Sequence, residues 1–160
     1  MALRKIMTNK EPQLHQVCRP VTEFNSRLHR LLDDMHETLE EAQGAGLAAP
    51  QVGILRRVVV VNIDDEVLEL VNPVLLETSG EQEGPEGCLS VPGKWGLVKR
   101  PWYAKVKAQD RYGNWFEAEG EEIVARCFCH ELEHLDGHLY TERVTRWMTD
   151  EEVQAYYDEE

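Results

Sequence analysis

The sequence predicts an α+β fold in which antiparallel sheets surround a central helix, with a further helix near the N-terminus. One segment with helical spacing precedes a group of β-branched and alternating segments, and a second helical segment follows that group. Helices and strands in regular alternation would instead indicate a parallel sheet. The length of 160 residues suits one compact unit, so we expect residues 1–160 to form a single domain.

The first helix is expected from Asn25 or Ser26 to about Gln43. Either residue can cap the first turn, and Gly44 and Gly46 follow as helix-ending signals. Apolar residues recur at helical spacing in between, at Leu28, Leu31, Leu32, Met35 and Leu39.

Strands are expected at 56–63 and 69–76, where β-branched residues are frequent and Asn72-Pro73 marks a bend or a sheet edge. Residues 104–109 alternate apolar and polar side chains, which is typical of a half-exposed strand. Tyr112-Gly113-Asn114 then predicts a hairpin turn into a partner strand at 115–118.

A second helix should run from about Glu121 to Leu135, with Gly137 placed to stop it. The final stretch, 149–160, has six acids and no Lys or Arg. We expect a short helix there that is capped by Thr149 or Asp150 and frays, in preference to a solvated tail.

The composition limits the partners. Acids outnumber bases 30 to 17, and a formal net charge of −13 disfavours DNA or any broad phosphate-backbone surface, although a small basic patch is compatible with it. The N-terminal ten residues lack the apolar core of a signal peptide. The longest apolar run, Val58–Val61, is far below the ~20 residues of a membrane span. We therefore expect a cytoplasmic protein that does not enter membranes.

The four cysteines are expected to be reduced. Cys127 and Cys129 are too close in the chain for a disulfide within regular structure, and a chain of this size does not need one. Cys18, Cys127 and Cys129 are interpreted as packed thiols.

His130-Glu131-Leu132-Glu133-His134 is the first segment that indicates chemistry. Residues four apart lie on one face of a helix, so the two imidazoles can bind one metal ion, and Glu131 lies beside that face. Two unrelated histidines on a polar face are the alternative. The apolar residues before His130 favour a buried helix, and buried histidines need partners.

A third ligand is needed, since catalytic metals usually have three protein ligands and one open position. Downstream, Tyr140 stands where a metzincin has its third histidine. Glu151 or Glu152 could serve as in thermolysin-like peptidases, but their acidic surroundings favour solvated residues. Cys88 is the better candidate. It lies in Glu86-Gly87-Cys88-Leu89-Ser90, which glycine-proline pairs on both sides predict to be a constrained loop and not a core strand.

A third unusual string is Gly44-Ala45-Gly46-Leu47-Ala48-Ala49-Pro50-Gln51, which alone would indicate only a helix end and a connector. Together, and in this order, the three strings resemble the signature motifs of the peptide deformylases, G-x-G-x-A-A-P-Q, E-G-C-L-S and H-E-x-x-H. The resemblance extends from the helix of Leu28 through Leu135.

The resemblance implies roles for seven residues. Cys88, His130 and His134 would be the metal ligands, and Glu131 the general base and acid. The side-chain amide of Gln51 and the backbone N–H of Leu89 would face the developing oxyanion, and the backbone at Gly46 would meet the formyl-peptide.

It also implies an enzyme that removes the formyl group from the N-terminal formylmethionine of newly made proteins and releases formate. The metal would be Fe²⁺, with Zn²⁺, Ni²⁺ or Co²⁺ able to replace it. The partners would be N-formylmethionyl peptides and nascent chains, with transient ribosome encounters. Some bacterial members dock through a basic C-terminal helix, which the acidic 149–160 segment cannot reproduce.

Three positions depart from the family pattern: Cys129 replaces Gln, Glu133 replaces Asp, and Gln43 replaces an acid. Glu133 is still expected to orient a histidine from outside the ligand set. A metallopeptidase and an inactive binding homologue are the other classes considered. The first needs a downstream ligand. The second should have lost Cys88, Gln51 or Glu131, and all three are present.

Overall fold

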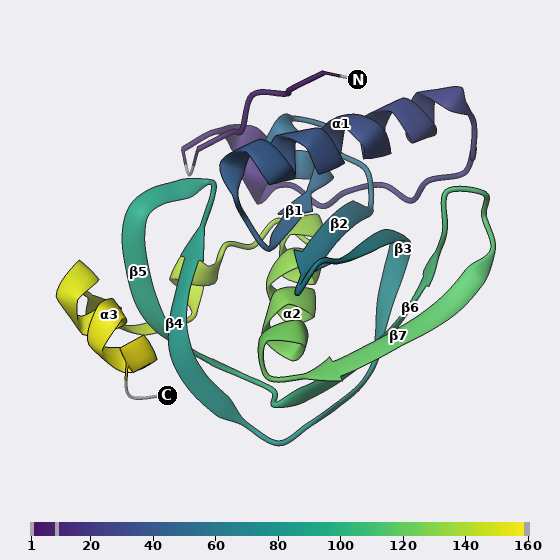
Figure 1. The fold of residues 1–160 in the computed structure, drawn as a ribbon. Coiled ribbons are helices and arrows are strands. Elements are labelled where there is room, and N and C mark those ends of the chain that lie inside the picture. Colours follow the sequence, from purple (N-terminus) through teal and green to yellow (C-terminus); the bar gives the residue numbers. More distant parts are fainter. Residues whose placement is uncertain (1, 9, 159–160) are drawn as a thin grey trace.

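The computed structural model describes residues 2–8 and 10–158 and contains two antiparallel sheets and three α-helices (Figure 1). The five-stranded sheet has the order β1-β2-β3-β6-β7, and the three-stranded sheet has the order β4-β5-β8. The helices are α1 (Ser26–Ala42), α2 (Ile123–Leu135) and α3 (Asp150–Asp158), with short 3₁₀ turns η1 (Pro12–His15), η2 (Ala49–Val52) and η3 (Tyr140–Glu142). The strands are β1 (Gly46–Ala48), β2 (Val58–Ile63), β3 (Glu66–Ser79), β4 (Gln82–Cys88), β5 (Val91–Arg100), β6 (Tyr103–Gln109), β7 (Trp115–Glu121) and β8 (Val144–Met148).

The predicted α+β class is confirmed, and α2 is the central helix. Strand β2 separates two apolar clusters, because successive side chains of a strand point to opposite faces. Val58 and Val60 pack with the apolar face of α1, whereas Val59 and Val61 pack with α2. A strand buried on both faces needs a continuous apolar run, which explains the four valines.

Helix α1 confirms the prediction at both ends. Asn25 Oδ1 accepts a hydrogen bond from the Leu28 N–H at 3.2 Å. The left-handed residue that closes the helix is Gln43, at φ 56°, and not one of the glycines that follow it. Gly44 packs closely against two leucines, since a Cβ there would lie 2.9 Å from Leu89 Cδ1 and 3.0 Å from Leu39 Cδ1.

The predicted bend at Asn72-Pro73 is confirmed. The pairing of β3 with β6 shifts between Val71 and Val74, and Asn72 has φ 50°. The predicted hairpin after residue 109 is also confirmed, with β7 extending to Glu121. Its turn is held by the Asp110 carboxylate, which accepts from the N–H groups of Tyr112 and Asn114.

The prediction of a loop at 86–90 is wrong for residues 86–88, which belong to strand β4 and pair with β5, whereas Leu89 and Ser90 form a turn. Glycine and proline are poor strand formers, but β4 is an edge strand, where the missing N–H of Pro85 is tolerated. Gly87 has a packing reason, since a Cβ there would lie 3.2 Å from the ring of Trp95.

The C-terminal part contains two predicted helices, α2 and α3, and one strand, β8, that was not expected. Helix α2 ends at Leu135, and Gly137 follows with φ +85°. The predicted C-terminal helix is α3, whose Glu152 N–H donates to Thr149 Oγ1 at 3.2 Å, while Glu159 and Glu160 lie outside the described residues. Within the described part of the chain, no helix is both long and apolar enough to cross a membrane.

Candidate active site

Three predicted metal ligands converge between the β4–β5 hairpin and α2. Cys88 Sγ lies 3.4 Å from His134 Nε2, and His134 Nε2 lies 3.3 Å from His130 Nε2. The three donor atoms lie within 4.8 Å of one another, and they are the one such group of three or more found among the described residues. Figure 1 shows α2 between this hairpin and the five-stranded sheet. Cys88 and His130 therefore come from different elements and meet only because the hairpin packs beside α2.

The orientation of His130 is set by Glu86. Glu86 Oε1 lies 2.8 Å from His130 Nδ1, and both side chains are buried. Burial alone would raise the pKa of Glu86, but hydrogen bonds from His130 and Arg100 hold it below its ordinary value. Glu86 is therefore a carboxylate, His130 Nδ1 carries the hydrogen, and Nε2 is left to face Cys88 and His134.

Glu86 belongs to a buried charge network. Arg100 binds it through two hydrogen bonds, Nε to Oε2 at 2.8 Å and Nη2 to Oε1 at 3.0 Å. Arg126 Nη1 donates to the same Oε2 at 2.7 Å. Since a buried carboxylate is stable only when it is paired, these two arginines keep Glu86 ionised beneath the histidine.

The expectation that Glu133 orients a histidine is wrong. Its carboxylate pairs with Arg100 and Arg143 and not with an imidazole. The residue that orients a histidine directly is Glu86, which sequence reasoning missed. Local spacing gave no signal for it, because this segment was predicted to be a loop and the pairing of β4 with β5 is irregular between Glu86 and Cys88.

Glu131 lies buried beside the three donors. Its Oε1 has no hydrogen-bond partner among the described residues. Burial raises the pKa of the carboxyl to about 7. A Cβ at position 46 would lie 2.6 Å from Glu131 Oε2, so only glycine leaves room for this side chain.

The structure also brings Gln51 and Leu89 to the cluster. Gln51 is buried, and its Nε2 lies 3.6 Å from Cys88 Sγ and donates to Ser90 Oγ at 3.1 Å. Its Oε1 accepts from the Ala48 N–H at 2.9 Å, which fixes the orientation of the amide. Leu89 follows Cys88 directly in the turn between β4 and β5.

A cavity of about 450 Å³ opens at the cluster. Cys88, His130 and Glu131 line it together with the predicted peptide-contacting Gly46. Its remaining wall is mostly apolar or glycine, including Leu89, Val91, Trp95, Ile123 and Cys127. This is the shape and lining of a site for a small, partly apolar ligand.

The downstream residues are not part of the donor cluster. The Glu152 carboxylate pairs with Arg146 and accepts a hydrogen bond from the Thr149 N–H at the start of α3. Tyr140 is buried and stacks on His130 at 5.8 Å between ring centroids, and its hydroxyl donates to the Lys94 carbonyl oxygen. Cys18, Cys127 and Cys129 are buried and free, which confirms that they are packed thiols.

The donors suit a transition-metal ion. One thiol and two imidazoles are ligands that iron, zinc, nickel or cobalt accept and that magnesium or calcium disfavours. Burial lowers the pKa of His134, which keeps this imidazole neutral for coordination. For His130 burial acts in the same direction, but hydrogen bonds with Cys88 and Glu86 outweigh it and raise the pKa. Such a donor set beside a buried carboxyl is typical of a metal-dependent hydrolase.

Comparisons with known proteins agree with this class. The family described as "Polypeptide deformylase" matches residues 3–150. The peptide deformylase of Agathobacter rectalis is 55% identical over 144 residues, which cover 90% of this chain and 91% of the relative. That of Caldicellulosiruptor bescii is 50% identical over 154 residues, covering 96% and 93%.

Solved structures give the same result. A peptide deformylase from Legionella pneumophila has a TM-score of 0.86 at 36% identity, covering 98% of this chain and 92% of the other. An actinonin-bound class I type b peptide deformylase from Acinetobacter baumannii has a TM-score of 0.85 at 36% identity, covering 91% and 100%.

The chain belongs to the peptide deformylase family. The resemblance seen in the three sequence motifs is thereby confirmed. The activity is hydrolysis of the formyl-methionine amide, which removes the formyl group from nascent peptides, and the family depends on a metal ion.

Proposed function

We propose that Cys88, His130 and His134 hold the metal ion of this deformylase. The observation that carries the proposal is their convergence from two elements, with three donor atoms within 4.8 Å. A divalent ion in such a site lowers the pKa of water, which makes water a nucleophile at neutral pH.

Glu131 is the proposed general base and acid. It is buried beside the donors, and a pKa of about 7 lets it hold or release a proton near neutral pH. It accepts the proton that the attacking water loses and passes it to the nitrogen of the leaving amine. One water and one formamide then give formate and a free amino group.

Gln51 and Leu89 are the proposed donors to the oxygen that gains negative charge. The Gln51 amide is preorganised, since its Oε1 is already fixed by the Ala48 N–H. Donors held in place before the reaction need no reorganisation, and loss of one typically costs ~3 kcal/mol of transition-state stabilisation.

The cavity supports a formyl-peptide substrate. Gly46 leaves its backbone open to a peptide beside Glu131, and apolar wall residues such as Trp95 and Ile123 can contact a methionine side chain. A formyl carbon carries only hydrogen, so it can reach the enclosed donors where a larger acyl group would clash. A formyl carbonyl is also more electrophilic than an internal amide.

The proposed metal is Fe²⁺, with Zn²⁺, Ni²⁺ or Co²⁺ able to occupy the same donors. A thiolate with two imidazoles suits each of these ions, so the donor set alone does not separate them. Metal analysis of anaerobically purified protein, run beside a formate-release assay, identifies the ion that accompanies activity.

The proposal is tested with Glu131→Gln on formyl-Met-Ala. The variant should keep its metal and lose ~10²–10⁴-fold in turnover, the usual contribution of general acid–base catalysis. Glu151→Gln is the matched control, because Glu151 is exposed on α3, and it should keep full activity. Cleavage of the Met-Ala bond by the wild type without formate would contradict the proposal and indicate a peptidase.

Several cellular properties are proposed with the activity. Residues 1–160 act as one domain in the cytoplasm, on N-formylmethionyl peptides and nascent chains, without DNA or membrane partners. Ribosome encounters are transient, because the acidic helix α3 repels RNA phosphates. Cosedimentation with ribosomes should therefore be weak, and stable binding at physiological salt would contradict the proposal.

A further inference from the structure

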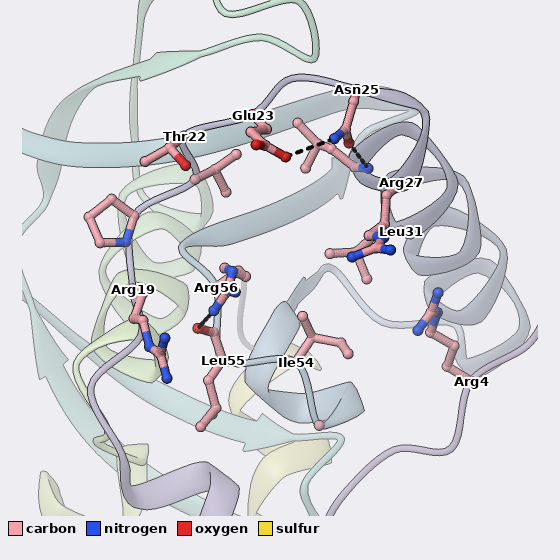
Figure 2. A pocket seen from close by; sticks show the side chains of 14 residues that line it. Arg4, Arg19, Thr22, Glu23, Asn25, Arg27, Leu31, Ile54, Leu55 and Arg56 are labelled. Carbon is pink, nitrogen blue, oxygen red and sulfur yellow. Dashed lines mark hydrogen bonds between the residues drawn. The ribbon is translucent and has the colours of Figure 1, made fainter.

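A second cavity, of about 790 Å³, lies between the first turns of α1, the segment before it and the residues after η2 (Figure 2). It shares no lining residue with the cavity at the donor cluster. Its lining contains one acid, Glu23, and four arginines, Arg4, Arg19, Arg27 and Arg56. We call this cavity the arginine pocket. The chain as a whole carries a formal charge of −13, so this positive excess is opposite in sign to the rest of the molecule.

Three of the four arginines have no carboxylate partner among the described residues. Arg4 pairs with Asp34 at 2.8 Å. The Arg56 side chain donates, among the described residues, only to the neighbouring Leu55 carbonyl oxygen, at 3.3 Å. The Arg19 and Arg27 side chains have no hydrogen bond or ion pair within the described ranges, and all three arginines are exposed. Arginines elsewhere, such as Arg100 and Arg111, are paired with glutamates.

The backbone holds two of these unpaired arginines side by side. Arg19 N–H donates to the Leu55 carbonyl oxygen at 3.1 Å, and Arg57 N–H donates to the Arg19 carbonyl oxygen at 3.0 Å. Residues 19 and 56 therefore form a parallel bridge. In Figure 2, Arg19 and Arg56 lie on one side of the pocket and Arg27 and Arg4 on the other. Like charges held together in this way are stabilised by a bound anion.

The inner surface of the arginine pocket is apolar. Leu28 and Leu31 are buried parts of the α1 core face, and Val21, Ile54 and Leu55 are half-buried beside them. No aromatic side chain lines the pocket. Stacking of bases on aromatic rings is the usual means of holding single-stranded nucleic acid, so this lining disfavours that class of ligand.

We propose that the arginine pocket binds a small amphiphilic anion, a phosphate or carboxylate that carries an apolar chain. Arg19 and Arg56, which lie on one side of the pocket, would bind the anionic group, since guanidinium donors match phosphate and carboxylate oxygens. The apolar chain would lie on Leu28, Leu31 and Ile54. A volume of about 790 Å³ is within the range of small-molecule sites.

The test is calorimetric titration of the metal-loaded protein with octyl phosphate, decanoate and inorganic phosphate at low salt. Octyl phosphate should bind at least about tenfold more tightly than inorganic phosphate, because only it buries an apolar chain. The relative affinities of octyl phosphate and decanoate identify the preferred anionic group.

Variants locate the binding. Arg19→Ala with Arg56→Ala should weaken octyl phosphate at least about tenfold, since charge-assisted contacts are lost. Ile54→Ser should weaken octyl phosphate and leave inorganic phosphate unchanged. Arg30→Ala is the matched control, because Arg30 is exposed on α1 but outside the pocket lining, and it should bind as the wild type does.

Three results would overturn the proposal. The first is octyl phosphate that binds no better than inorganic phosphate. The second is binding that survives loss of both Arg19 and Arg56, which would locate the ligand elsewhere, including at the metal. The third is a single-stranded oligonucleotide that binds more tightly than octyl phosphate and displaces it, which would assign the surface to nucleic acid.

Discussion

The molecule contains the same arrangement of glutamate, arginine and histidine twice. Glu86 is bound by two hydrogen bonds from Arg100 and lies 2.8 Å from a nitrogen of His130. Glu69 is bound by two hydrogen bonds from Arg111, at 3.0 and 2.6 Å, and lies 2.7 Å from a nitrogen of His36. Each group joins three elements: β4, β5 and α2 in the first case, and β3, the β6–β7 turn and α1 in the second.

The two groups differ in burial and in what the histidine faces. The Glu86 side chain is 4% exposed and that of Glu69 is 19% exposed. The far nitrogen of His130 lies 3.3 Å from His134 Nε2, within the donor cluster, whereas His36 belongs to no such cluster among the described residues. The contacts of Glu69 therefore only link three elements of the fold. The same kind of contacts at Glu86 also hold a proposed metal ligand in place.

The largest expected difference is in metal retention, between variants of His130 and of His36. His130→Ala, like Cys88→Ala and His134→Ala, should lose the metal and all activity, because two protein donors do not retain the ion. His36→Ala should keep stoichiometric metal, as should the thiol control Cys18→Ala. The measurement is metal content after gel filtration. Full metal content in Cys88→Ala would contradict the three-ligand assignment and reopen the case for a downstream ligand.

A smaller difference is expected in folding stability. Glu86→Gln leaves the buried Arg126 without a carboxylate and leaves Arg100 with Glu133 alone, and breaking a buried pair in this way typically costs about 3–5 kcal/mol in the free energy of unfolding. Glu69→Gln should cost only about 1 kcal/mol, because water and Asp33 remain available to Arg111. Urea unfolding of the metal-free proteins gives both values. Equal losses in the free energy of unfolding would show that the difference in burial between Glu86 and Glu69 does not affect stability.

The smallest expected effect is the pH dependence at Glu69. Burial opposes ionisation, but hydrogen bonds from His36 and Arg111 lower the pKa of Glu69 to about 2. A lowered folded-state pKa stabilises the fold above the ordinary value of 4.5 and ceases to do so as the pH falls towards 2. The wild type should exceed Glu69→Gln by about 1 kcal/mol at pH 7 and by less at pH 3. A difference independent of pH would exclude this ionisation as the cause.

Local patterns in the sequence predicted most of the fold. Helix α1, strands β2 and β3 and the β6–β7 hairpin follow from apolar spacing, β-branched residues and turn residues. The β4–β5 hairpin could not be predicted in this way. Its glycines and Pro85 lower the strand propensity. Pro85 is tolerated because β4 is an edge strand, and Gly87 makes room for the ring of Trp95, and both causes exist only in the folded protein.

The candidate site, too, was predicted where local motifs define it and missed where it depends on tertiary contacts. The motifs indicated Cys88, His130, His134, Glu131 and Gln51, which the structure brings together. The contacts of Glu86 with Arg100 and Arg126 were missed, because three distant elements must meet before that network exists. The prediction that Glu133 orients a histidine failed for the same reason. Its partners, Arg100 and Arg143, reach it only in the folded protein and cannot be inferred from local spacing.

The most direct test of the central claim, that the Glu86 group supports the metal and the Glu69 group does not, is a metal affinity measured on two matched variants. Zn²⁺ competition with a chelator gives the affinity of Glu86→Gln and Glu69→Gln beside the wild type. Glu86→Gln should bind the ion ~10–100-fold more weakly, the usual effect of losing a hydrogen-bond partner of a ligand histidine. Glu69→Gln should match the wild type. Equal affinity in all three proteins would contradict the claim that Glu86 supports the metal through His130.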